Sequence, residues 1–201
     1  MNLLERIHES YVFDRRTAVL SSLIAPMFPA SARVLDIGSG DGKLARSIIE
    51  KRPDVSIEGV DVLVRVDALI PVREYDGAHL PYESGSFDVV LLVDVLHHTV
   101  DPELLMREAV RVARGNLIIK DHTREGAFAN TTLLFMDRVG NARHGVAIPA
   151  NYWRKQRWRD AFNTLNFRVV SWTANIPLYP FWATWLFGRS LHFLAQLDVA
   201  A

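Results

Sequence analysis

The 201-residue sequence has no cysteine, no excess of charge of either sign and no long apolar run. Without cysteine, disulfides, zinc–thiolate sites and thiol nucleophiles are excluded. The 23 basic and 23 acidic residues cancel, so the overall charge gives no reason to expect a nucleic-acid partner. The most apolar stretch, residues 176–188, is too short to span a bilayer, and residues 1–9 lack the features of a secretion signal. We therefore expect a cytoplasmic protein without a nucleic-acid partner.

Strand and helix patterns alternate along most of the chain. Strands are expected at residues 33–37, 56–60, 72–75, 87–93, 116–120, 167–173 and 191–197. Helices are expected at residues 3–12, 17–27, 42–51, 101–112, 126–139 and 151–165, with at most one helical turn in the short crossover 62–70. Continuous apolar strands such as 87–93 are typical of a parallel sheet that helices cover on both faces. The sequence therefore predicts an α/β fold with a Rossmann-like, mainly parallel, doubly wound sheet of about seven strands, preceded by N-terminal helices.

A glycine-rich loop follows the first of these strands. Gly38, Gly40 and Gly42 alternate with other residues, and Asp36 lies two residues before the first glycine. Glycine lets the backbone come close to a ligand where a Cβ atom would clash. The helix that follows offers free N–H groups and the positive end of its dipole. The pattern indicates a ligand site, and the alternative is a tight turn that binds nothing.

Other nucleotide-binding loops fit this segment less well. A phosphate-binding P-loop needs Ser or Thr after Gly–Lys, but Leu44 stands there, and its first glycine would fall on Ile37. The dinucleotide fingerprint accepts Gly38 and Gly40 but places Lys43 at its third small position. A nicotinamide-dependent Rossmann oxidoreductase therefore stays open as an alternative.

The D-x-G-x-G-x-G pattern resembles motif I of the class I S-adenosylmethionine (SAM)-dependent methyltransferases. Residues 80–90 resemble the L-P-F-x-(D/E)-x-S-F-D-x-V stretch of a small-molecule branch that includes ubiquinone-pathway enzymes, and residues 95–98 resemble its V-L-H-H segment. The likeness rests on motifs over residues 31–121 and only on layout elsewhere. It implies SAM as the cofactor and one antiparallel strand among the two late strands.

The resemblance also implies roles for residues at the carboxyl ends of the strands, where ligands of open parallel sheets bind. The implied cofactor ligands are Asp36, Gly38, Ser39, Gly40, Gly42, Asp61, Asp76, Gly77, Val93 and Asp94. The loop from Gly38 to Gly42 would face the methionine part of SAM, and Asp36 would position the loop or meet the amino group through water. Val93 and Asp94 would line the same side.

Asp61 follows the second strand at the spacing at which a carboxylate accepts hydrogen bonds from ribose hydroxyls. Asp76 and Gly77 follow the third strand, where the family contacts the adenine. Each acid has a plain structural alternative. Asp61 could cap a helix, and Asp76 could stabilise a turn with Gly77.

These observations predict that residues 1–201 form a single methyltransferase domain. It would contain N-terminal helices (1–30), a cofactor-binding core (31–122), and substrate-side helices with closing strands (123–201). The predicted activity is methyl transfer from SAM to a small acceptor. The alternatives are the oxidoreductase named above and a non-catalytic SAM-binding interaction module.

Histidines after the fourth and fifth strands are the candidate catalytic residues. His97, His98 and His122 could serve as a general base for the acceptor, and each could instead be a helix cap or a packed ring. Asp121, Asp137 and Tyr152 also fall in the region expected to cover the substrate. No H-x-x-x-H pair or facial-triad spacing is present, so the sequence predicts no metal.

The segment 177–188 is rich in aromatic residues. It could form a hairpin arm on the sheet, an apolar wall for the substrate or a contact with a membrane surface. The last two interpretations favour an acceptor that is hydrophobic or lipid-like.

Overall fold

The computed structural model describes residues 13–141, 151–180, 183–188 and 190–199. Its centre is a seven-stranded sheet in the order β3-β2-β1-β4-β5-β7-β6. The strands are β1 (Arg33–Ile37), β2 (Ser56–Asp61), β3 (Val72–Glu74), β4 (Phe87–Val93), β5 (Ala113–His122), β6 (Phe167–Thr173) and β7 (His192–Val199). Strand β7 runs antiparallel to both β5 and β6, and the pairs among β1 to β5 are parallel. The predicted sheet, including its late antiparallel strand, is confirmed. The helix expected at 3–12 lies outside the described residues.

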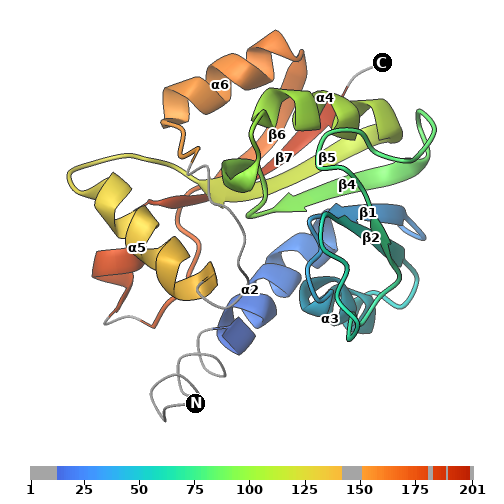
Figure 1. Ribbon diagram of the computed structural model, residues 1–201, viewed down its shortest axis with the longest axis horizontal. Helices are drawn as coiled ribbons and strands as arrows, with labels where there is room; N and C mark the ends of the chain where they lie inside the picture. Colours follow the sequence, from blue (N-terminus) through green and yellow to red (C-terminus); the bar gives the residue numbers. More distant parts are fainter. Residues whose placement is uncertain (1–12, 142–150, 181–182, 189, 200–201) are drawn as a thin grey trace.

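Helices cover both faces of the sheet (Figure 1). On one face lie α2 (Asp14–Ile24), continued by the short turn η2 (Ala25–Met27), and α3 (Lys43–Lys51). On the other face lie α4 (Pro102–Val112) and α6 (Lys155–Thr164), while α5 (Ala129–Asn141) lies beyond the end of the sheet. None of the helices in the described part of the chain is long and apolar enough to cross a membrane.

Strand β4 shows why the sheet is buried on both faces. Val89 and Leu91 pack into the core under α2 and α3, whereas Val90 and Leu92 pack into the core under α4 and α6. Side chains alternate between the faces of a strand, so a strand covered twice must be apolar throughout. Helix α4 begins where Asp101 accepts a hydrogen bond from the backbone N–H of Leu104 at 2.9 Å.

Several bounds differ from the expected ones, and three of the differences have a clear physical reason. Strand β5 continues to His122, because Asp121 and His122 pair with residues of β7. The crossover 62–70 contains no helix, which agrees with the expectation of at most one helical turn. Helix α5 begins only at Ala129, since Phe128 adopts a φ of 61°, which the αR conformation does not allow. Helix α6 begins at Lys155, because the preceding chain is extended and the N–H of Asn151 bonds to the carbonyl of His97.

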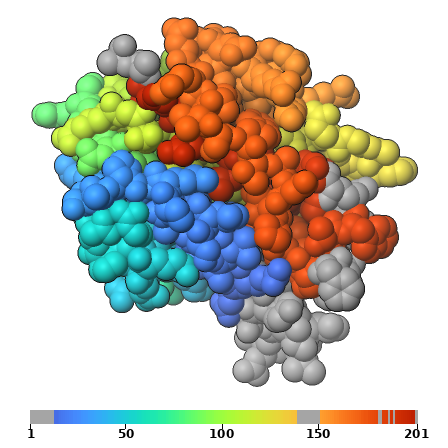
Figure 2. Space-filling view, turned by 180° about the vertical axis from the view of Figure 1, so that it is seen from behind, coloured from blue at the N-terminus to red at the C-terminus, as the bar shows by residue number. Residues whose placement is uncertain are grey.

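The chain between β6 and β7 returns across the carboxyl ends of the strands. It includes a short π-helical turn, η4 (Thr184–Gly188). In the view from behind, α2 in blue lies beside this orange-red segment, and Arg15 donates a hydrogen bond to the carbonyl of Pro177 at 3.2 Å (Figure 2). Helix α2 therefore closes one side of the edge at which the candidate site lies.

Candidate functional site

The glycine loop, residues 36–42, connects β1 to α3 and is anchored to β2. The N–H of Gly38 donates to the carbonyl of Val60 at 2.7 Å. Gly38, Gly40 and Gly42 have φ values of 69°, 59° and 73°, in the left-handed region that favours glycine. A Cβ atom at Gly38 would lie 2.3 Å from Cγ2 of Val95, so this position also requires glycine for space.

Asp61, at the end of β2, is bonded to the loop. Its Oδ2 accepts the N–H of Gly40 at 2.8 Å, and its Oδ1 accepts the N–H of Leu63 at 3.0 Å. No helix follows Asp61, so the helix-cap alternative is wrong. The carboxylate instead ties the loop to the edge of the sheet and faces the same space as the loop backbone.

Asp36 lies buried at the end of β1, close to Asp61. Burial and the negative charge of Asp61 raise the pKa of Asp36 to about 7. Within the described residues, neither acid forms an ion pair with lysine, arginine or histidine. Two neighbouring carboxylates without a protein cation favour a ligand that carries positive charge.

The other implied cofactor residues lie around this loop. The Oγ of Ser39 is buried without a hydrogen-bond partner among the described residues. Asp76 accepts the N–H groups of Ala78 and His79, and these bonds lower its pKa to about 2. Gly77 follows with a φ of 84°. Asp76 therefore does stabilise a turn, and its part in adenine recognition stays a prediction. Val93 ends β4 on the side of the sheet that packs against α2 and α3.

Asp94 follows Val93 and has two cationic partners. Nζ of Lys120 lies 2.5 Å from its Oδ1, and Arg16 of α2 bonds to its Oδ2. Burial alone would raise the pKa of Asp94, but these two cations hold it well below its ordinary value. Lys120 is fully buried in β5. Arg16 and Lys120 were not foreseen as site residues, although a lysine within an apolar strand was a usable signal.

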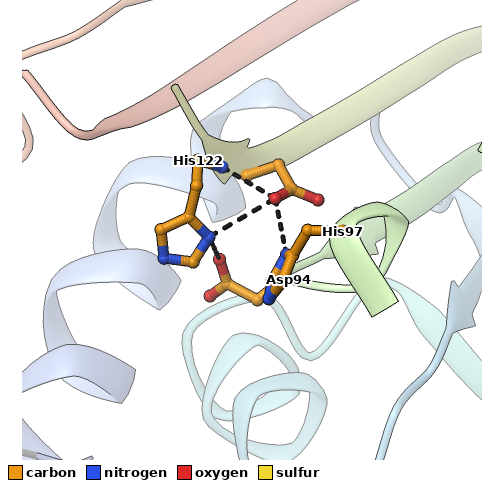
Figure 3. Close-up of side chains that lie close together, drawn as sticks. Asp94, His97 and His122 are labelled. Atoms are coloured by element: carbon orange, nitrogen blue, oxygen red, sulfur yellow. Dashed lines mark hydrogen bonds and ion pairs between the residues drawn. The ribbon is translucent and has the colours of Figure 1, made fainter. Parts of the chain in front are cut away.

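His97 and His122 converge on the acids at the ends of β4 and β5 (Figure 3). His97 belongs to a short 3₁₀ turn, η3 (Leu96–His98), and its Nδ1 lies 2.7 Å from Oδ1 of Asp121. The Nδ1 of His122 lies 3.5 Å from Oδ1 of Asp94. Burial would lower the pKa of His97, but Asp121, with Asp137 and Asp94, raises it to about 10. Burial, helped by Lys120 and His97, lowers the pKa of His122.

Asp137 of α5 and Tyr152 complete this group. Oδ1 of Asp137 lies 3.6 Å from Nε2 of His97, and its Oδ2 accepts a hydrogen bond from the Tyr152 hydroxyl. The ring of His98 packs 3.9 Å from that of His97, centroid to centroid. We call His97, His98, Asp121, His122 and Asp137 the histidine cluster. The sequence analysis identified these residues as candidates, but it did not predict that their side chains contact one another.

An apolar wall borders the histidine cluster. The ring of Tyr179 lies 5.7 Å from that of His192 on β7 and 5.6 Å from that of Phe187 on η4. Phe187 in turn lies 6.5 Å from Phe135 of α5. Among the described residues of segment 177–188, Leu178 and Ala183 are buried. The segment thus packs at the carboxyl edge of the sheet.

Sequence comparison identifies the family. The profile of a methyltransferase domain matches residues 9–172. A 27-O-demethylrifamycin SV methyltransferase of Amycolatopsis mediterranei is 32% identical over 130 residues, 56% of this chain and 47% of that protein. A ubiquinone biosynthesis O-methyltransferase of Xanthomonas oryzae pv. oryzae is 30% identical over 113 residues, 49% and 46% of the two chains. An uncharacterized methyltransferase of Mycobacterium bovis is 31% identical over 162 residues, which are 73% of this chain and 60% of that protein. The chain thus spans about half the length of these relatives.

Solved structures share the fold at low identity. A SAM-dependent methyltransferase of Aquifex aeolicus matches with a TM-score of 0.61 and 14% identity, over 90% of this chain and 89% of that chain. A chain from the complex of the Haloferax volcanii Trm112 methyltransferase activator with a methyltransferase matches with a TM-score of 0.72 and 15% identity. The match covers 98% of this chain and 94% of that chain. These likenesses establish the fold. With the profile match over most of the sequence, they show that the chain belongs to the class I SAM-dependent methyltransferases.

Proposed function

We propose that this chain is a SAM-dependent methyltransferase that acts on a small molecule. The observation that carries the proposal is the bond from Gly40 N–H to Asp61, which joins the glycine loop to a carboxylate at the next strand end. SAM supplies an electrophilic methyl group on a sulfonium centre when it is bound. The protein then has to hold the cofactor, orient the acceptor and keep water out.

The residues of the loop fit this cofactor. A Cβ atom at Gly40 would have open space around it, with Arg65 the nearest group at 3.8 Å. Each oxygen of Asp61 accepts one backbone N–H and keeps a lone pair for a ribose hydroxyl. The negative charge of Asp36 and Asp61 would meet the ammonium and sulfonium groups of SAM. The hydroxyl of Ser39 is buried against Gly59 of β2, which leaves the loop backbone to face the cofactor.

The candidate catalytic residues, His97, His98 and His122, would face the acceptor. Asp121 orients the ring of His97 through Nδ1, which leaves Nε2 turned toward Asp137. The neighbouring Tyr179 and Phe187 give this side an apolar wall, which supports a hydrophobic or lipid-like acceptor. Two of the relatives named above are a 27-O-demethylrifamycin SV methyltransferase and a ubiquinone biosynthesis O-methyltransferase, which supports a small-molecule acceptor.

Calorimetric titration of the purified chain with S-adenosylhomocysteine tests the proposal, with NAD as the control ligand. We expect micromolar binding of the former alone. Asp61→Ala should lower the affinity at least tenfold, because it removes a charged hydrogen-bond acceptor worth about 1.5–3 kcal/mol. Asp160→Asn, on the exposed face of α6, should leave the affinity unchanged, as should His97→Ala and His122→Ala.

Other outcomes would favour the alternatives. Binding of NAD alone would support an oxidoreductase and contradict the proposal. Binding of S-adenosylhomocysteine without turnover on a broad panel of acceptors would support a non-catalytic SAM-binding module. Unchanged affinity in Asp61→Ala would show that Asp61 is not the ribose ligand.

We also propose that segment 177–188 touches a membrane surface from a cytoplasmic location. Trp185 is 70% exposed, and Phe128 and Phe135 near α5 are 79% and 57% exposed. Aromatic rings of this kind favour the boundary between water and lipid. Trp185→Ala should lower co-sedimentation with phosphatidylcholine vesicles several-fold, whereas Val170→Ala on β6 should not. Equal sedimentation of both variants and the original chain would contradict this contact.

The division of the chain into N-terminal helices (1–30), a cofactor-binding core (31–122) and a substrate-side part (123–201) remains part of the proposal. It is supported by the position of the glycine loop and Asp61 within the core, and by the position of Asp137 and Tyr179 after it. The balanced charge of the chain supports a small-molecule partner rather than nucleic acid.

A further inference from the structure

Three side chains of the histidine cluster converge on one buried point. One ligand atom each from His97, His98 and Asp137 lies within 4.8 Å of the others. Nε2 of His97 is 3.6 Å from Oδ1 of Asp137, which is too long for a hydrogen bond. Nε2 of His97 and Nδ1 of His98 are both buried without a hydrogen-bond partner among the described residues. Buried ring nitrogens are seldom left in this way, so the arrangement calls for something between them.

The outer groups around this point hold its side chains in fixed orientations. Asp121 lies 2.7 Å from Nδ1 of His97, which turns Nε2 toward the common point. The hydroxyl of Tyr152 donates to Oδ2 of Asp137 and leaves Oδ1 facing His97. Histidines that bind metals commonly carry such a carboxylate partner on the second ring nitrogen, and ligating carboxylates are themselves hydrogen-bonded.

The charges near the point also favour a cation. Asp94, in the same region, is balanced by Lys120 and Arg16. By contrast, the ion pairs that Asp121 and Asp137 form with other described residues are all to histidines. A divalent ion would replace the proton on Nε2 of His97 and balance both carboxylates.

We propose that His97, through Nε2, together with His98 and Asp137, binds a divalent transition-metal ion. Two imidazoles and one carboxylate suit such an ion, and three protein ligands leave coordination positions open. Since this point lies on the acceptor side of the proposed methyltransferase, the open positions would take an oxygen atom of the acceptor, such as a phenol or enol. That role rests on the proposed function, whereas the metal site itself does not.

The test uses the full chain after treatment with a chelator and exchange into chelator-free buffer. Cobalt(II) is added while visible absorption is recorded, and zinc(II) binding is measured by calorimetry. We expect one equivalent of either ion to bind with micromolar or tighter affinity, with the absorption of a protein-bound cobalt ion. Asp137→Asn and His98→Gln should each weaken binding at least tenfold. Tyr152→Phe should weaken it less, since it removes only the outer bond to Asp137.

His79→Gln is the matched control, because His79 is an exposed histidine that pairs with Asp76 away from the cluster. It should bind cobalt as the original chain does. Circular dichroism and thermal unfolding establish that each variant is folded. Absence of stoichiometric binding, or equal affinity in the Asp137 and His98 variants, would overturn the metal site. Titration with S-adenosylhomocysteine is independent: binding of that ligand without cobalt binding would reject the metal and keep the proposed function, and the reverse result would reject the function alone.

Discussion

The glycine loop and the group around Asp94 lie at the same edge of one sheet, but they balance buried negative charge differently. At the loop, burial and Asp61 raise the pKa of Asp36 to about 7, and no described lysine or arginine pairs with either acid. At the end of β4, Lys120 and Arg16 hold the pKa of Asp94 well below its ordinary value, although burial acts to raise it. The first region leaves its negative charge without a cationic partner among the described residues, whereas the second neutralises it within the protein.

This comparison predicts different effects of substitutions in the two regions on the free energy of unfolding. The largest effect is expected at Lys120. Lys120→Met removes the buried cation on Oδ1 of Asp94 and leaves this carboxylate with Arg16 and the neighbouring His122. Removing one partner of a buried ion pair costs about 3–5 kcal/mol, so the free energy of unfolding should fall by about 3 kcal/mol or more. Urea denaturation at pH 7 measures this. Lys51→Met, on the exposed last turn of α3, should change stability by less than about 0.5 kcal/mol. If Lys120→Met and Lys51→Met lowered the free energy of unfolding equally, Lys120 would not neutralise Asp94 as described.

The glycine loop allows a sharper test with two neighbouring glycines. Gly38→Ala should cost about 2–4 kcal/mol, because its positive φ is strained for alanine and its Cβ would overlap Val95. Gly40→Ala should cost only the strain of about 1–2 kcal/mol, since its surroundings are open. Denaturation of the ligand-free chain measures both.

A second substitution separates strain from overlap. Val95→Ala combined with Gly38→Ala should recover the part of the loss that comes from overlap and leave the part that comes from φ. If Gly38→Ala and Gly40→Ala were equally stable, the packing of the loop against Val95 would not explain the need for glycine.

The smallest effect is expected from Asp36 and depends on pH. The folded chain holds the Asp36 proton up to about pH 7, whereas the unfolded chain releases it near the ordinary pKa of 3.8. Stability therefore falls as the pH rises from about 4 to 7 and stays lower above that range. Asp36→Asn removes this loss. The free energy of unfolding of the variant, relative to that of the original chain, should therefore be higher at pH 8 than at pH 5 by on the order of 1–3 kcal/mol.

Denaturation curves of both proteins at pH 5 and pH 8 measure the Asp36 effect. Asp160→Asn, on an exposed helix face, keeps Asp36 and should lose stability between these two pH values as the original chain does. If Asp36→Asn lost as much stability between pH 5 and pH 8 as the original chain, the raised pKa of Asp36 would be wrong.

Much of the fold could be predicted from the sequence because its signals are local. The apolar run 87–93 and the pattern around Asp36 fixed β4, β1 and the loop within short segments. The Asp101–Pro102 pair marked the start of α4 in the same way. Boundaries that depend on partners were missed: β5 extends to His122 only because β7 lies beside it. The short crossover 62–70 has no helix, since its chain instead bonds to the loop.

The sequence by itself determined the glycine loop and the position of Asp61 beside it, because a strand, its glycine turn and the next strand end lie close together in the chain. Only the tertiary structure decided the histidine cluster. His97, Asp121, Asp137 and Tyr152 come from separate segments, and Arg16 reaches Asp94 from α2. No spacing along the chain encodes these contacts, since they arise when the ends of β4 and β5 meet α2 and α5. Burial then shifts the pKa values of these groups, which no isolated segment could do.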